Sequence, residues 1–523
     1  MVREIVMARL FGAGVAYDTF LLGMRIPNLL RNLFAEGALS SAFVPVFSQT
    51  LSARGKGAAS KLSDSVATAQ LLVVGSICAA GILFAPQLVM LLAPGYAAVP
   101  GKFELAVLLT RIMFPFLLLV ALAAQAMGLL NACGSFGVPA MASTFFNLGS
   151  LAAGLAIGFT ISNRFRQGMI VSMAIGVVAG GLLQLLWQLP SLYRQGFGFH
   201  PGIDWHDPAL RRVFRLMIPA LLGTAAVQIN VIVNTNLASS LTDSAGHVIS
   251  GPVSWLGYAF RFLQFPVGIF GAAIATATLP EISRSAAADR MQDFGAALVR
   301  AVGLAFLLTI PASVGLAILG RSIIATIFEG GRFTHFDTSQ TAAALACYSV
   351  GLAGYSVIKI LAPAYYALDD GRTPVLVSLA SVGLNAAAAV TLIHWAHLGT
   401  AGLALATSLV ALCGAAALFV LLRRRLPALR HTGLLSSTIR IGLASAVMAI
   451  AVAASSSAME RVAGVGKLAS AADIALSIPL GAAVFYIAAR ALRVPQLEAL
   501  IAACYTAFRN ASRPEVGHPP ARD

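Results

Sequence analysis

Charged side chains are scarce in this sequence. Asp, Glu, Lys and Arg make up 11% of the 523 residues, whereas apolar residues make up 58%. An ordinary soluble domain carries about a quarter charged residues, and no soluble core can bury this much apolar sequence. The apolar runs are long and continuous rather than alternating, which indicates membrane-spanning helices and excludes a β-barrel. We therefore predict an all-α polytopic membrane protein.

Sequence signatures of catalysis are also missing. The chain has no G-x-x-x-x-G-K-[ST] phosphate loop, no H-E-x-x-H pair, no G-x-S-x-G elbow and no Asp-rich metal motif. None of the five cysteines belongs to a C-x-x-C pair. Because most of them lie in or beside apolar runs, they indicate packing residues rather than a disulfide framework or a zinc site. The sequence therefore predicts neither an enzyme nor a cofactor.

About fourteen apolar segments are candidates for spans, each of which takes about 20 residues as a helix. They lie at about 1–13, 17–47, 65–93, 104–132, 138–162, 168–190, 212–241, 252–281, 295–319, 339–368, 373–395, 399–422, 436–458 and 470–492. The first is incomplete, because about 13 helical residues rise only about 20 Å, against a bilayer core of about 30 Å. We therefore expect an upstream start that supplies the missing residues.

Basic residues are unequally divided between the two sides of this arrangement. With a cytoplasmic N-terminus, about twenty Lys and Arg fall on the cytoplasmic side and about eight on the other. The positive-inside rule therefore predicts that both termini are cytoplasmic. The formal net charge of +15 then indicates contact with anionic membrane lipids rather than with nucleic acid.

Two pairs of prolines suggest an internal repeat. Pro45 and Pro280 share one offset, about 235 residues, with Pro139 and Pro374. The alternative is chance among 23 prolines. Two parallel halves around a central cavity would be a common transporter plan. We expect four parts: a first lobe of helices 1–6 over 1–212, a second lobe of helices 7–12 over 213–430, two C-terminal helices over 431–495, and a basic cytoplasmic tail over 496–523.

Segment 17–47 carries polar side chains inside apolar sequence, namely Asp18, Arg25, Asn28, Arg31, Asn32 and Glu36. Four of them share one face of an ideal helix: Asp18, Arg25, Asn32 and Glu36. A kink at Pro27 would spread this stripe. Because ionisable residues are costly in a span, we expect the face to line a water-filled cavity. The alternative is an internal salt-bridge set in which Glu36 pairs with Arg31 or Arg25.

Segment 252–281 carries a second polar face. Ser254, Tyr258 and Arg261 follow one another by steps of four and three, with Gln264 beside them. This segment has no carboxylate that neutralises Arg261. An unneutralised arginine inside a span indicates an anionic ligand, and a guanidinium group suits a phosphate. Snorkelling of Arg261 to the interface is the alternative.

Two further segments carry ionisable residues. Arg3 and Glu4 are neighbours in the first segment, and we expect that they can pair. Lys359 lies within an apolar segment, where it is either a coupling residue or a snorkelling lysine.

Three stretches are distinctive: REIVMARLFGAGVAYDTFLLGMRIPNLLRNLFAEGALSSAFVPVFS, SWLGYAFRFLQFPVGIFGAAIATATLPEIS and SVIKILAPAYYALDDGRTPV. They resemble the signature of the MurJ/MviN family, which belongs to the MOP exporter superfamily. The resemblance implies a multi-pass inner-membrane flippase with fourteen helices in two lobes around a central cavity. It also implies peptidoglycan biosynthesis as the context, so that other cell-wall synthesis proteins are expected partners.

The substrate that the resemblance implies is lipid II, the undecaprenyl-pyrophosphate-linked peptidoglycan precursor, which moves from the cytoplasmic to the periplasmic leaflet. By the motif match, the family's cavity positions hold Arg3, Asp18, Arg31, Glu36 and Arg261. The chain departs from the family pattern in two ways. It begins inside the first helix, and Phe260 and Gln264 stand where many relatives carry acidic residues.

Three rival functions are open at this stage. A MATE-like drug or cation antiporter of the same superfamily would need an acidic cavity, whereas the candidates here are mainly basic. A flippase for another lipid-linked oligosaccharide would use similar arginines. A membrane enzyme acting on lipid-linked sugars would need paired carboxylates or a metal site. The energy source, either a coupling ion or the membrane potential, stays unassigned.

Overall fold

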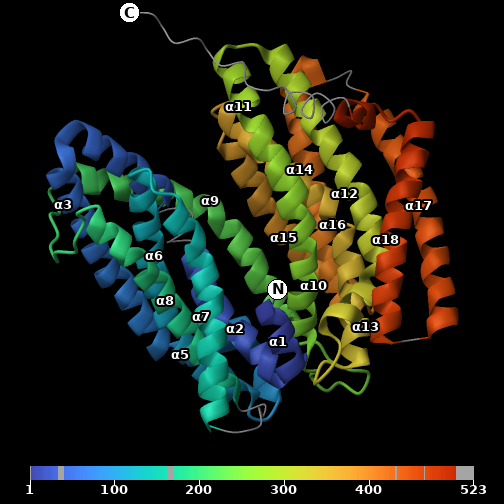
Figure 1. Ribbon diagram of the computed structural model, residues 1–523, viewed down its shortest axis with the longest axis horizontal. Coiled ribbons are helices and arrows are strands. Elements are labelled where there is room, and N and C mark those ends of the chain that lie inside the picture. The colour runs from blue at the N-terminus through green and yellow to red at the C-terminus, as the bar shows by residue number, and fades with distance from the viewer. Residues whose placement is uncertain (1, 33–39, 162–168, 430–432, 465, 502–523) are drawn as a thin grey trace, which may run out of the picture. The chain divides into compact units, whose positions relative to one another are not determined.

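A computed structural model describes residues 2–32, 40–161, 169–429, 433–464 and 466–501, and this part of the chain consists of helices joined by loops (Figure 1). Within these ranges there is no β-strand beyond two isolated bridges. The α-helices are α1 (Val2–Phe11), α2 (Val15–Arg31), α3 (Ser40–Leu83), α4 (Ala85–Leu92), α5 (Lys102–Met113), α6 (Pro115–Ala132), α7 (Gly137–Ile161), α8 (Ile170–Arg194), α9 (Pro208–Ser239), α10 (Pro252–Pro266), α11 (Ala273–Ala287), α12 (Met291–Phe328), α13 (His335–Ser349), α14 (Leu352–Ala367), α15 (Arg372–His394), α16 (Gly399–Arg425), α17 (Leu434–Ala463) and α18 (Lys467–Ala491). Short helical turns add η2 (Pro94–Ala98), η4 (Val267–Ala272) and η5 (Pro427–Leu429).

The helices are long and apolar enough for a polytopic membrane protein. Ten described helical segments can cross a bilayer by length and composition, and α13 with α14 forms an eleventh candidate that is bent by 45°. The predicted all-α membrane fold is confirmed. The number fourteen stays a prediction, because α1 has only 10 residues and predicted span 17–47 includes residues outside the described ranges.

Proline and glycine mark the irregular points of the long helices. α10 ends at Pro266, and the π-helical turn η4 follows before α11 continues. A proline has no N–H to donate, so the ordinary ladder of helical hydrogen bonds is disturbed there. Inside α3, Gly55 has a φ of 77°, which glycine adopts without steric cost, and the helix breaks at this residue.

Small residues let α7 and α8 pack closely. A Cβ atom added to Gly176 would lie 2.4 Å from the carbonyl oxygen of Ser150. One added to Gly180 would lie 2.6 Å from the carbonyl oxygen of Phe146. The runs GSLAAGLAIG and IGVVAGGLL lie in these two helices, and small residues of this kind allow close helix packing.

The described chain forms two compact units, each with its own core. Unit 1 comprises Met1–Tyr258, Ile327–Thr341 and Ser378–Leu403, and unit 2 comprises Ala259–Thr326, Ala342–Val377 and Ala404–Asp523. One apolar core of unit 1 includes Phe43, Phe47, Leu62 and Leu129. The main core of unit 2 includes Phe294, Leu361, Tyr365 and Leu418. The predicted division at 212 and 430 stays a prediction.

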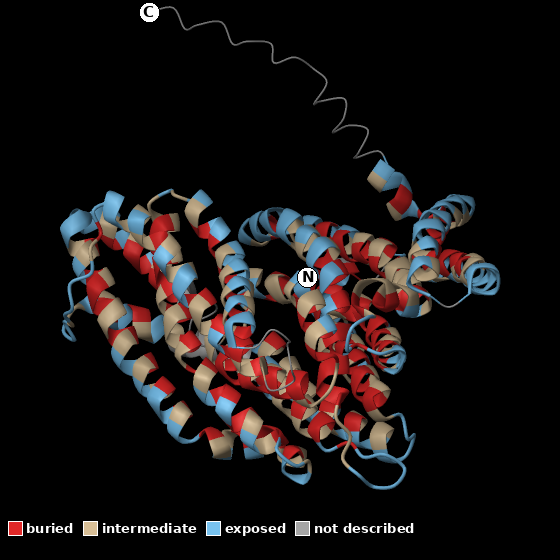
Figure 2. Cartoon of the chain, turned by 60° about the horizontal axis from the view of Figure 1, so that its bottom comes forward, coloured by how far each residue is buried: buried red, intermediate tan, exposed pale blue. Residues whose placement is uncertain are grey.

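Apolar side chains also cover outward faces. On α17 and α18, Ile450 is 72% exposed and Ile487 is 65% exposed. Only 28% and 17% of the most apolar windows of these two helices are buried, and Figure 2 shows exposed residues along both. Helices this apolar satisfy their backbone internally and can meet lipid with such faces.

One of the two proline pairs of the proposed repeat occupies matching places. Pro139 is the third residue of α7, and Pro374 is the third residue of α15. Pro45 and Pro280 both lie inside helices, α3 and α11. A proline near a helix start costs no hydrogen bond, because the first N–H groups have no partner within the helix. The relation between two halves stays a prediction that these positions support.

Candidate functional site

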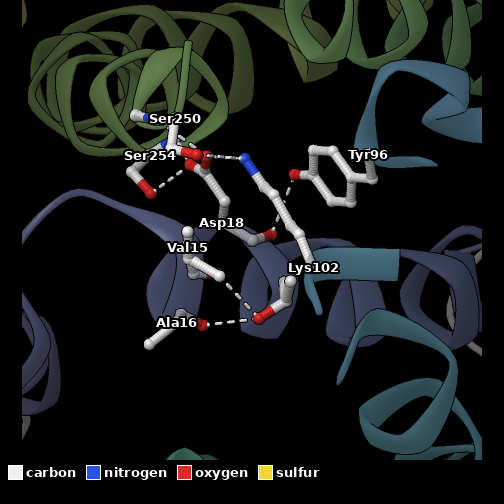
Figure 3. A network of polar contacts seen from close by, with 9 residues as sticks. Val15, Ala16, Asp18, Tyr96, Lys102, Ser250 and Ser254 are labelled. Carbon is white, nitrogen blue, oxygen red and sulfur yellow. Dashed lines mark hydrogen bonds and ion pairs between the residues drawn. The ribbon is translucent and has the colours of Figure 1, made fainter. Parts of the chain in front are cut away.

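Asp18 of α2 is the centre of a largely buried polar network in unit 1 (Figure 3). Its side chain is 0% exposed, and its Oδ2 accepts a hydrogen bond from Lys102 Nζ at 2.8 Å. The same oxygen accepts the N–H of Gly251 at 2.8 Å. Oδ1 accepts both the N–H and the hydroxyl of Ser254, at 2.9 and 2.5 Å. Asp18 therefore caps the N-terminus of α10 from another helix, where the helix dipole favours a negative charge.

Neighbouring residues complete this network. Lys102 also donates to Ser250 Oγ at 3.1 Å and lies 4.2 Å from the ring centre of Tyr96. The Tyr96 hydroxyl donates to the Asp18 carbonyl at 3.2 Å. Gly251 has a φ of 125° and lies against the ring of Trp255, so a side chain would not fit there. The local sequence S-G-P-V-S thus brings two backbone N–H groups to one carboxylate.

This geometry changes the interpretation of Asp18. The sequence places it on a face that lines a cavity, but here its carboxylate has four protein donors and no exposed surface. A buried ion pair is costly unless its remaining hydrogen bonds are satisfied, as they are here. In this conformation Asp18 joins α2, α5 and α10, and any contact with substrate would require the network to open.

Tyr258 lies in an aromatic cluster of unit 1 and not on an open polar face. Its side chain is 1% exposed. The ring stacks on Tyr17 at 4.6 Å and contacts Phe328 at 4.8 Å and Phe333 at 5.4 Å. Aromatic pairs at such distances stabilise a core beyond the area that they bury. Tyr258 is therefore a packing residue in this conformation, and its contact with substrate stays a prediction.

Arg3 on α1 forms the ion pair that the sequence suggests. Its Nη2 lies 3.1 Å from Glu4 Oε1, and its Nε donates to the other carboxylate oxygen at 3.3 Å. The guanidinium also lies 5.7 Å from the ring centre of Phe146 on α7. Arg3 Nη1 is buried without a hydrogen-bond partner among the described residues. A buried donor of this kind is available to an anion or a water molecule.

The other polar residues of α2 are half-buried in unit 1. Arg25 Nη1 donates to Thr235 Oγ1 on α9. Asn28 Oδ1 is buried and accepts no hydrogen bond within the described part of the chain. Arg31 Nη2 donates to Asn32 Oδ1 at 3.3 Å. Glu36 lies outside the described residues, so its suggested ion pairs with Arg25 or Arg31 stay predictions.

Three of the predicted site residues belong to unit 2, and all three are exposed. Arg261 and Gln264 lie three residues apart on α10, and Lys359 lies on α14. Lys359 makes no hydrogen bond or ion pair with the described residues. Phe260 packs its ring edge-on against Tyr348, with the ring centres 5.5 Å apart. Exposed charged side chains in the middle of apolar helices are consistent with a surface that contacts water rather than lipid.

The sequence did not predict two hydrogen-bonded pairs of polar side chains that join α9 and α15 in unit 1. Asn230 donates to Ser381 Oγ at 3.2 Å, and Asn385 donates to Asn234 Oδ1 at 2.8 Å. The residues are four apart on both helices, so each pair lies one turn from the other. The spacing of the asparagines on α9 was the available signal.

A buried acid in unit 2 was missed as well. Asp473 on α18 is 2% exposed, and its carboxylate accepts three hydroxyl hydrogen bonds. They come from Ser322 on α12 at 2.6 Å, Ser456 on α17 at 2.9 Å and Ser477 on α18 at 2.7 Å. One carboxylate thus links three helices through hydroxyl donors, and polar contacts of this type hold membrane helices together.

Replacing Asp473 by leucine should loosen this junction. The three hydroxyls would lose their acceptor, and we expect a loss of about 1–2 kcal/mol in the free energy of unfolding. Asp473→Asn keeps one acceptor oxygen and should lose less. The unfolding midpoint of purified protein measures the effect, with Ser470→Leu on the same helix as the control. A midpoint in Asp473→Leu equal to that of the unmodified protein would contradict the assignment.

Comparisons with known proteins place the chain in a family. A family model described as "Lipid II flippase MurJ" matches residues 7–471. The chain belongs to this family. A "Probable lipid II flippase MurJ" of Vibrio cholerae is 36% identical over 433 residues, which cover 80% of this chain and 78% of the relative. A "Lipid II flippase MurJ" of Burkholderia cenocepacia is 34% identical and covers 81% and 80%.

Solved structures show the same fold. The structure of a lipid II flippase MurJ in an inward closed conformation matches with a TM-score of 0.74 and 24% identity, over 94% of this chain and 96% of that one. An inward-facing multidrug resistance MATE transporter of the MOP superfamily matches with a TM-score of 0.64 and 15% identity, over 82% and 98%. Membership of the MurJ family makes this chain a multi-pass inner-membrane transporter and not an enzyme, as the sequence predicts.

Proposed function

We propose that this MurJ-family chain moves lipid II from the cytoplasmic to the periplasmic leaflet of the inner membrane. The observation that carries the proposal is the family match, which extends from residue 7 to residue 471. Relatives more than 30% identical over most of both chains carry the name lipid II flippase. The proposed mechanism is alternating access, in which a cavity opens to one side of the membrane at a time.

Basic side chains inside apolar helices support an anionic substrate. Arg3, Arg25 and Arg31 lie half-buried or deeper in unit 1. Lys102 neutralises Asp18, so this carboxylate does not offset their charge. A pyrophosphate offers several oxygens to guanidinium groups, and such charge-assisted bonds strengthen where bulk water is excluded. The unpartnered Nη1 of Arg3 is one donor that a phosphate oxygen can use.

The network around Asp18 supports a conformational step. It fixes the start of α10 to α2 and α5 through a buried carboxylate and a buried ammonium group. A cavity that opens at this end has to separate these groups and hydrate them. The cost of exposing the ion pair is partly regained from water, which allows the network to hold one state without preventing the other.

The energy source within this proposal is the membrane potential or a coupling ion. A charge that crosses the membrane gains about 2.3 kcal/mol per 100 mV. Lys359 is the candidate coupling residue of unit 2, because its exposed ammonium group has no partner among the described side chains.

Complementation tests the function. The gene should restore growth and rod shape in cells depleted of their own lipid II flippase, and purified protein in vesicles should expose labelled lipid II to an external reagent. A flippase for another lipid-linked oligosaccharide would also bind pyrophosphate but would fail to restore growth. A cation antiporter of the same fold would fail as well and would instead move a cationic dye.

Reporter fusions test the proposed orientation, in which both termini are cytoplasmic. A fusion at residue 248, in the loop before α10, should report the periplasmic side, and a fusion at the C-terminus should report the cytoplasmic side. The physical reason is the excess of basic residues in the connections assigned to the cytoplasm. A periplasmic C-terminus would exclude the arrangement of fourteen spans.

A further inference from the structure

The ends of α11 and α12 enclose a small charged pocket in unit 2. Its volume is about 300 Å³. The polar side chains that line it are Glu281, Arg284, Ser285, Arg290, Asp293 and Arg300. None of these residues belongs to the polar stripes inside the spans, and the proposed function does not use them.

A tight turn builds this pocket. Asp289 adopts a φ of 54°, and the Arg290 N–H donates to the Ser285 carbonyl at 2.9 Å. The chain thereby reverses between α11 and α12 within a few residues. On α11, Glu281, Arg284 and Ser285 lie three and four positions apart and share one face. The turn fixes this face beside the first turns of α12.

The charges in the pocket do not cancel. Arg300 pairs with Glu281, and Arg290 lies 3.4 Å from Asp293. Arg284 has no acidic partner among the described residues, and its Nε donates to the Pro280 carbonyl at 3.1 Å. Its two terminal nitrogens therefore remain available. The pocket carries one uncompensated positive charge, which matches the single negative charge of a phosphodiester.

The position of the pocket indicates where that phosphodiester comes from. α11 ends one candidate membrane span, Pro252–Ala287, and α12 begins the next, Met291–Phe328. The pocket therefore lies where apolar spans meet the headgroup layer. Leu279, near the end of α11, is exposed and provides an apolar surface for an acyl chain. Basic pockets between membrane helices at this level suit lipid headgroups.

We infer that this pocket binds the headgroup of an anionic phospholipid through Arg284, with Arg290 and Arg300 beside the phosphate. The bound lipid would fix the α11–α12 turn from outside the transport path. In the proposed orientation the pocket faces the cytoplasmic leaflet. The binding test below does not depend on translocation, so it can fail while the proposed function holds.

The experiment uses the purified full chain in detergent micelles and titrates short-chain phosphatidylglycerol, with phosphatidylcholine as the neutral lipid. Binding is measured by native mass spectrometry and by the shift in unfolding midpoint. We expect Arg284→Gln to weaken phosphatidylglycerol binding about fivefold, and Arg284→Gln with Arg290→Gln about 25-fold. The control is Arg424→Gln, which removes an exposed arginine outside the pocket at the end of α16.

Each outcome decides the inference. Selective weakening in the two pocket variants, with Arg424→Gln unchanged, supports it. Equal weakening in all three variants would show general surface attraction and overturn it. Competition by inorganic phosphate at the same concentration as the lipid would mean a phosphate-ion site and overturn the lipid assignment. The substituted residues Arg284, Arg290 and Arg424 are all exposed. Without lipid, each variant should therefore keep the unfolding midpoint of the unmodified protein, which the same measurement checks.

Discussion

Lys102→Met should remove most of the folded protein from the membrane. The substitution leaves Asp18 fully buried without its cation, and breaking a buried pair by removing one partner costs about 3–5 kcal/mol. Native domains are stable by only about 5–15 kcal/mol, so such a loss removes a large share of this margin. The measurement is the amount of monodisperse protein extracted from membranes, together with its unfolding midpoint.

A second substitution should restore part of this loss. Asn at position 18 removes the negative charge and keeps an acceptor oxygen for Ser254, so Asp18→Asn combined with Lys102→Met should be more stable than Lys102→Met alone. The matched control is Lys61→Met, because Lys61 is an exposed lysine of the same unit. If Lys102→Met extracts and unfolds like the control, the buried network does not stabilise the fold as we describe.

Arg31→Ala and Arg261→Ala should each lower lipid II translocation about 10- to 100-fold at normal membrane levels. Under the proposed anionic-substrate mechanism, each substitution removes a charge-assisted contact worth about 1.5–3 kcal/mol. Arg31 is half-buried in unit 1, and Arg261 is exposed in unit 2, so neither is needed as a core residue. Arg261→Lys keeps the charge and loses the planar fork, so its activity should be intermediate.

Translocation and membrane expression have to be measured in the same cells. A purely structural arginine would lower the amount of protein and leave the activity per molecule unchanged. Arg194→Ala, at an exposed site in the last turn of α8, is the control for a lost surface charge. Full translocation by Arg31→Ala and Arg261→Ala at normal expression would rule out the proposed anion cavity.

Features that depend on neighbours along one helix were readable from the sequence. The all-α membrane fold follows from the long apolar runs. In lipid a backbone has to satisfy its own hydrogen bonds, and a helix does so within one segment. The Arg3–Glu4 ion pair joins adjacent residues. The small-residue runs of α7 and α8 indicate close packing, because small residues let helices approach closely, whereas the pairing of these two helices comes from the structure.

Partners that lie far apart in the chain were decided only by the tertiary structure. Asp18 and Lys102 are 84 residues apart, and Asp18 and Ser254 are 236 apart. Helical periodicity gives the direction of each side chain relative to its own helix, but not the helix that it meets. Tyr258 shows the consequence. The sequence places it on a polar face of its own helix, but in the structure its ring contacts aromatic rings from other segments.

By itself the sequence determined the class of protein and the family, because these depend on composition, hydrophobic run length and local motifs. The tertiary structure alone decided which polar residues are available. It buries Asp18 among four hydrogen-bond donors, leaves Arg284 without an acidic partner among the described residues, and surrounds Asp473 with hydroxyls from three helices. The reason is physical: the cost of a charge in a membrane protein depends on the groups that pack around it, and those groups come from distant segments of the chain.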